Sequence, residues 1–103
     1  MTKIVFNREM LRIELSGHAG SAEAGKDLVC AAESILTYTL LGAASEKDYH
    51  ATAYVNPKEG KTCLQCYPTE EERDRCKETL RTIAVGFEFL AEQYPEFVRF
   101  EVI

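Results

Sequence analysis

The sequence predicts one α+β domain over residues 1–103, with the element order β-β-α-β-β-α-β and a mostly antiparallel sheet packed against two helices. Three observations predict this fold class. The length of 103 residues suits one domain. Two long segments carry apolar residues at helical spacing, and five short segments have the character of strands. Hydrophobic residues make up 46% of the chain and charged residues 28%, as in globular proteins.

The first segment is predicted to form a β-hairpin. Residues 2–6 and 10–16 alternate apolar and polar side chains, which is typical of half-buried strands, and residues 7–9 separate them as a turn. The residues expected on the buried face of the second strand are Leu11, Ile13 and Leu15.

A helix is then expected from Asp27 to about Ala44. Asp27 suits the N-cap position because its carboxylate can accept hydrogen bonds from the first free amides. Residues 17–25, which precede it, are small, polar and rich in Gly and Ala, and they are expected to form a mobile loop. The predicted apolar side of the helix comprises Leu28, Ala32, Ile35, Leu36, Thr39 and Ala43.

A second hairpin is predicted from strands at residues 49–55 and 61–67, because residues 56–60 (Asn-Pro-Lys-Glu-Gly) are strong turn formers. A second helix is expected from Thr69 to about Tyr94, with Thr69 and Glu72 as a capping box. Residues 97–103 alternate again and predict a last strand. The apolar stripe of the second helix comprises Cys76, Leu80, Ile83, Phe87, Leu90 and Tyr94.

The charge of the chain argues against a general nucleic-acid-binding protein. The net charge is −5, and the basic residues are scattered, whereas phosphate binding needs clustered Lys and Arg. The segment after Met1 has no apolar core of a signal peptide, and no apolar run is expected to be long enough to cross a bilayer. We therefore expect a cytoplasmic protein without nucleic-acid or membrane partners, whose four cysteines are reduced thiols.

Cys30 and His18 are the candidates for catalysis. With Asp27 as N-cap, Cys30 falls in the first turn of its helix, where free amides and the helix dipole favour the nucleophilic thiolate. It also lies nearly opposite the predicted apolar side. His18, at the exit of the second strand, can take the thiol proton and pass it to a leaving amine. A cysteine and a histidine this close also occur by chance, so a structural role stays open at this point.

Cys63 and Cys66 form a C-x-x-C pair that we do not interpret as a metal or redox site. Residues three apart on a strand point to opposite faces, which suits neither chelation nor a disulfide. Cys76 adds only a third thiol and belongs to the apolar stripe, so it is expected in the core. No metal and no cofactor are expected, and any other role of the pair is left open.

Two motifs carry a family resemblance. Residues 17–19 are Gly-His-Ala, and residues 25–32 are Gly-Lys-Asp-Leu-Val-Cys-Ala-Ala, followed by Ser34. They resemble the ribosomal-processing cysteine protease family, Prp, whose members carry Gly-His-Ala and Gly-x-Asp-Ile-Val-Cys-Ala motifs. Leu28 stands where isoleucine is usual. The motifs cover the N-terminal third, and the remainder is similar in size and pattern.

The resemblance implies a bacterial, homodimeric cysteine endopeptidase. It implies removal of a short N-terminal extension from a large-subunit ribosomal protein precursor, with Cys30 as the nucleophile that forms a thioester and His18 as the base. Asp27 matches the family's aspartate and would cap the helix, orient His18, or do both. The loop would close over substrate as a lid. The glycines expected to give this lid its flexibility are Gly17, Gly20 and Gly25.

A second hypothesis is a non-catalytic ribosome-associated or assembly protein that uses the same groove only to bind. The two hypotheses differ in thiol chemistry. A catalytic Cys30 should react with iodoacetamide below neutral pH and faster than the other cysteines, whereas a binding protein should show an ordinary thiol.

Overall fold

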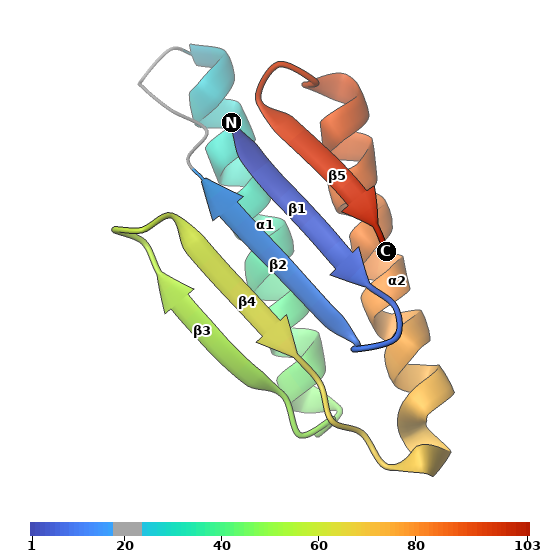
Figure 1. Ribbon diagram of the computed structural model, residues 1–103. Helices are drawn as coiled ribbons and strands as arrows, with labels where there is room; N and C mark the ends of the chain where they lie inside the picture. Colours follow the sequence, from blue (N-terminus) through green and yellow to red (C-terminus); the bar gives the residue numbers. More distant parts are fainter. Residues whose placement is uncertain (18–23) are drawn as a thin grey trace.

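The computed structural model describes residues 1–17 and 24–103, with side chains described for residues 1–17 and 28–103. Within these ranges the order of elements is the predicted β-β-α-β-β-α-β, with a short 3₁₀ helix, η1, added before the second helix (Figure 1). The elements are β1 (Thr2–Asn7), β2 (Arg12–Gly17), α1 (Ala24–Glu46), β3 (Thr52–Asn56), β4 (Lys61–Gln65), η1 (Glu70–Glu72), α2 (Arg73–Gln93) and β5 (Val98–Val102).

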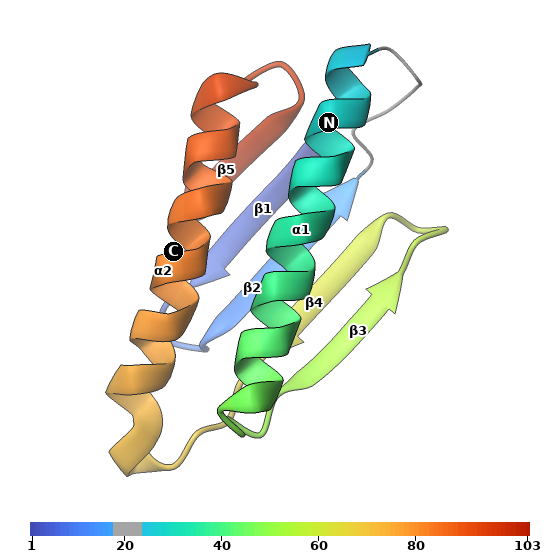
Figure 2. The same cartoon turned by 180° about the vertical axis from the view of Figure 1, so that it is seen from behind.

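The strands form one mixed sheet in the order β3-β4-β2-β1-β5. Three of its pairings are antiparallel, and only β5 runs parallel to its neighbour β1, so the prediction of a mostly antiparallel sheet is confirmed. Both helices cover the same face of the sheet and run antiparallel to one another (Figure 2). The fold is therefore one layer of helices on one layer of sheet.

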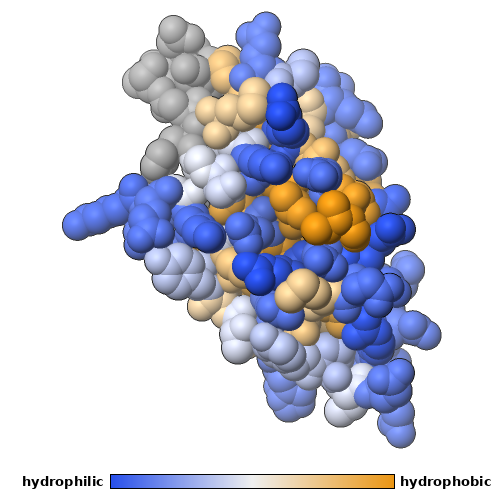
Figure 3. All heavy atoms as spheres, viewed as in Figure 1, coloured by the Kyte–Doolittle hydropathy of each residue, from blue (hydrophilic) through white to orange (hydrophobic). Residues whose placement is uncertain are grey.

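The alternation along the strands separates a buried face from an open one. Ile4, Phe6, Ile13 and Leu15 are buried under the helices, and Leu11 is buried just before β2, as predicted. The other face of the sheet is largely hydrophilic (Figure 3). The alternation of apolar and polar residues along the strands therefore determines which face of the sheet the helices cover.

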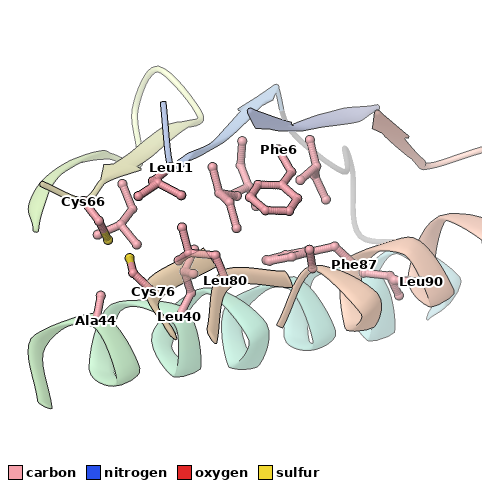
Figure 4. Packing of buried hydrophobic residues seen from close by; sticks show 14 of the residues in the cluster. Phe6, Leu11, Leu40, Ala44, Cys66, Cys76, Leu80, Phe87 and Leu90 are labelled. Atoms are coloured by element: carbon pink, nitrogen blue, oxygen red, sulfur yellow. The ribbon is translucent and has the colours of Figure 1, made fainter. Parts of the chain in front are cut away.

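The apolar stripe of α2 is also confirmed. Cys76, Leu80, Phe87 and Leu90 are buried against the sheet (Figure 4). Ile83 and Tyr94 are partly buried at the edge of this core.

The predicted capping box at the start of this helix is wrong. Thr69 makes no side-chain capping hydrogen bond, and residues 70–72 form η1 before α2 begins at Arg73. The amide of Glu72 donates instead to the backbone oxygen of Thr69 at 3.0 Å, so a tight backbone turn replaces the side-chain cap.

The apolar side predicted for α1 is wrong by about one residue. The buried residues of α1 are Val29, Leu40 and Ala44, whereas Leu28 is 64% exposed and Ile35 is 68% exposed. Adjacent helical residues point roughly 100° apart, so a shift of one residue selects a different face. Large apolar residues stand at both 28 and 29, and packing on the sheet selects Val29. Ala32 and Leu36 flank this line and are partly buried, as predicted.

The segment Leu28–Glu46 of α1 corrects the prediction that no apolar run is long enough to cross a bilayer. By length and composition alone it qualifies, with a mean hydropathy of 1.4. Only 17% of the segment is buried. Core helices pass the same test, and α1 does pack Leu40 and Ala44 into the core. The helix α1 therefore has two apolar sides, of which one packs on the sheet and the other is exposed to solvent.

The corrected face of α1 can be tested by stability. Leu40→Ala removes a fully buried side chain, so we expect the free energy of unfolding to fall by about 2–5 kcal/mol. Thr39→Ala, at the adjacent exposed position, should change it by less than about 0.5 kcal/mol. Urea denaturation followed by circular dichroism measures both, and equal losses would contradict the assigned face.

Candidate active site

A cavity of about 260 Å³ lies where α1, the start of β1, the end of β2 and the β3–β4 hairpin meet. These segments gather at one end of the sheet (Figure 1). From α1 the cavity receives Cys30, Glu33, Ser34 and Thr37, whose spacing of three, four and seven residues places them on one side of the helix. Its apolar wall includes Leu15, Leu41 and Val55.

Cys30 is exposed, as predicted. Its neighbour Val29 is fully buried, and the turn of the helix brings the cysteine out of the core and into the wall of the cavity. The residues that share its side of the helix, Glu33, Ser34 and Thr37, all line the same cavity. The sequence therefore located this side of the helix correctly, although the apolar side was misplaced.

The start of α1 corrects the prediction for Asp27. The helix begins at Ala24, so Asp27 lies within its first turn and is not the N-cap. Cys30 becomes the seventh helical residue. The dipole effect fades within the first turn, and only the first four amides of a helix are free. The helix dipole and the free amides therefore cannot favour the Cys30 thiolate as expected.

The predicted loop over residues 17–25 is shorter than expected. Gly17 is the last residue of β2, and Gly25 lies in α1. His18 and Gly20 lie outside the described residues, as does the side chain of Asp27. Gly17, which directly precedes His18 in the sequence, lines the cavity that contains Cys30. The pairing of His18 with Cys30 stays a prediction.

Gly17 fixes how the chain leaves β2. Its φ of +98° is a conformation that residues with a side chain rarely adopt. A Cβ there would collide with the backbone oxygen of Met1. The Gly17 amide donates to the backbone oxygen of Gly60 at 2.8 Å, which ties the end of β2 to the β3–β4 hairpin in the wall of the cavity.

Glu33 is a cavity residue that sequence reasoning passed over as a polar neighbour of Cys30. Its Oε2 accepts a hydrogen bond from the Thr2 hydroxyl at 3.1 Å, and Thr2 itself is buried. Burial of the carboxyl raises the pKa of Glu33, and the Thr2 hydrogen bond and the Met1 amino group only partly oppose this. Its position one helical turn after Cys30 is the feature of the sequence that could have identified Glu33 as a cavity residue.

The other cysteines lie outside this cavity. Cys63 is partly exposed on β4, whereas Cys66 and Cys76 are buried with their sulfur atoms turned toward one another (Figure 4). Burial raises the pKa of Cys66 to about 12 and also raises the pKa of Cys76, so both are neutral thiols. Across residues 1–17 and 24–103 no three His, Cys, Asp or Glu side chains are grouped to hold a metal ion.

Comparisons with known proteins point to one family. The model of a family described as cysteine protease Prp matches residues 1–99. No match was found among curated proteins.

Solved structures with the same fold include the protein SMU.848 from Streptococcus mutans, which is 26% identical, with a TM-score of 0.78 over 99% of this chain and 91% of that chain. The essential ribosomal processing protease Prp from S. aureus, in complex with a covalently linked product peptide, is 19% identical, with a TM-score of 0.82 over 100% of both chains. The same enzyme with a substrate peptide is 21% identical, with a TM-score of 0.78 over 99% of this chain and 97% of that chain.

A substitution at Gly17 tests the geometry of the cavity wall. Gly17→Ala should lower the free energy of unfolding by about 1–3 kcal/mol, because the new methyl group meets the Met1 backbone at a strained φ. Gly42→Ala is the matched control, since nothing lies within 4 Å of its added Cβ. In a helix this change should stabilise by about 0.5–1 kcal/mol. Thermal unfolding of the two variants should therefore shift in opposite directions, and shifts in the same direction would refute the backbone assigned to Gly17.

Proposed function

We propose the function of this chain from the premise that it belongs to the Prp family of cysteine proteases, whose model matches residues 1–99. The chain is accordingly a cysteine peptidase. Its proposed substrate is the precursor of a large-subunit ribosomal protein in the bacterial cytoplasm, from which it removes a short N-terminal extension. The S. aureus relative of the same fold is a ribosomal processing protease and was solved with substrate and product peptides, which supports a peptide substrate here.

The observation that carries the assignment is the position of Cys30. It is exposed and lines the cavity, whereas Cys66 and Cys76 are buried. Cys63 is partly exposed, but it is not among the cavity residues. A nucleophile must reach a substrate carbonyl, so Cys30 is the cysteine placed for attack.

The proposed reaction uses Cys30 and His18. His18 takes the proton of the thiol as the sulfur attacks the scissile carbonyl, and the carbon–nitrogen bond then breaks as His18 returns the proton to the leaving amine. The acyl group stays on Cys30 as a thioester. Water, deprotonated by His18, then attacks this thioester and releases the acid product with the free thiol.

Asp27 is proposed to orient His18. Of the two roles implied by the family motif, helix capping loses its basis because α1 begins at Ala24. Orientation of the base by a carboxylate is the remaining role, as in other nucleophile–histidine sites.

The chain is also proposed to act as a homodimer that pairs through the outer side of its helices. Leu28, Ile35 and Tyr38 on α1 are 64%, 68% and 72% exposed, and Val85 and Phe89 on α2 are 49% and 61% exposed. Both helices cover one face of the sheet (Figure 2), so their outward sides face the same way. Large apolar groups gathered on one surface are typical of protein interfaces. A second copy would cover them and leave the polar face of the sheet in solvent.

The catalytic assignment is tested by Cys30→Ala. The variant should lose at least about a thousandfold in cleavage rate, because no other group supplies the nucleophile. Cys63→Ala, at the partly exposed thiol outside the cavity, is the control and should cleave at the normal rate. Mass spectrometry of the ribosomal protein precursor after incubation measures both. Normal processing by Cys30→Ala, with its fold intact by circular dichroism, would support the binding-protein hypothesis instead.

The dimer is tested by Ile35→Glu. A charge placed within the proposed interface cannot be buried without a partner. Ile35→Glu should therefore raise the dissociation constant of the dimer by at least about a hundredfold. Met10→Glu places the same charge at an exposed apolar residue in the turn between β1 and β2 and should leave the dimer unchanged. Sedimentation velocity distinguishes the two states. A dimer that persists in Ile35→Glu would locate the interface elsewhere.

A further inference from the structure

A second cavity, of about 360 Å³, lies farther along α1 than the first cavity, which contains Cys30. It lies between the last turns of α1 and β3, the edge strand that neither helix covers (Figure 2). Small residues form much of its wall, which leaves room for a ligand. They are Ala44 and Ser45 on α1, and Ala51 and Ala53 on and before β3.

The two cavities form one groove beside α1. Leu41 lines both of them. Val55 and Thr62 line the first cavity, whereas Ala53 and Leu64 line the second. Ala53 is paired with Leu64 and Val55 with Thr62 in the β3–β4 register, so these side chains lie on one face of the sheet. The floor of the groove therefore continues from the first cavity to the second along both strands.

The second cavity is apolar at its base and fixed at its far end. Leu64 is buried and Leu41 is partly buried. The turn at residues 48–50 lines the far end. Within this turn Tyr49 is buried, and its hydroxyl oxygen lies 3.3 Å from that of Thr79. A ligand can thus bury apolar surface here without first ordering the wall.

The length of the groove suits an extended peptide. Ala44 follows Cys30 by fourteen residues on α1, which is about 21 Å along a helix axis. An extended peptide advances about 3.3 Å per residue, so it covers this length in about six residues. A peptide whose scissile bond lies at the Cys30 sulfur would therefore reach the second cavity with a side chain about six residues away.

We propose that the second cavity is a distal subsite for a large apolar side chain of the peptide substrate, about six residues from the scissile bond. The proposal rests on the proposed function, because it requires a peptide to be held at Cys30. Continuity of the groove with the first cavity favours the substrate as the occupant. The small side chain of Ala53 makes it a specificity residue, since a larger one would fill the subsite.

The test measures cleavage of peptides that span the processing site of the ribosomal protein precursor. Each position on either side of the cleaved bond is replaced in turn by leucine or by serine, and mass spectrometry gives kcat/KM. At one position five to seven residues from the bond, we expect leucine to raise kcat/KM by about tenfold or more over serine, mainly by lowering KM.

Two variants locate this preference in the groove. Ala53→Phe places a ring opposite Leu64 and should abolish the leucine advantage. Thr52→Phe is the matched control, because the adjacent residue of the strand points to the other face of the sheet. It should keep the advantage. Each leucine-to-serine ratio is measured within one protein, so a general loss of stability cannot create or remove it.

The proposal is overturned if the unmodified chain shows no leucine advantage at this distance. It is also overturned if the advantage persists in Ala53→Phe or is lost equally in Thr52→Phe. If a second copy of the chain fills the groove instead, the distal advantage will be absent and Ala53→Phe will change the sedimentation velocity. Cleavage without a distal preference contradicts only the subsite, whereas absence of any cleavage contradicts the proposed function itself.

Discussion

The burial of Val29 against the sheet is the constraint on which the site depends. Val29 is fully buried, and successive residues of a helix point about 100° apart. Once Val29 faces the sheet, Cys30 must face the space beside the end of β2, and Glu33, Ser34 and Thr37 follow on the same side. The position of Cys30 in the cavity wall is thus set by the packing of its apolar neighbour Val29.

The rotation of α1 is also fixed from the side by α2. A Cβ at Gly86 would lie 2.5 Å from Cδ2 of Leu36, so the two helices are in close contact at this point. Leu36 is partly buried on the side of α1 that packs against the core cluster. A helix held by the sheet below and by α2 beside it has little freedom to turn. This rigidity matters for the site, because the α1 residues that line the cavity face it at only one rotation of the helix about its axis.

The sequence correctly predicted those parts of the fold in which the apolar residues form only one pattern. The strands alternate cleanly, as at Leu11, Ile13 and Leu15, and α2 has one apolar stripe, so both were predicted correctly. In α1, Leu28 and Val29 offer two competing apolar sides, and only the sheet and α2 decide between them. The burial of the Glu33 carboxyl depends on its packing beside Thr2, thirty-one positions away, which local spacing cannot indicate.

The corrected start of α1 changes how the thiol must be activated. Because Cys30 is the seventh residue of the helix, the helix terminus no longer supplies the positive potential that favours a thiolate. In the proposed mechanism that task passes to His18, so activation of the Cys30 thiol would depend on a base outside the described residues. Glu33, in the same cavity, works in the opposite direction when it is charged, since a nearby negative charge disfavours a thiolate.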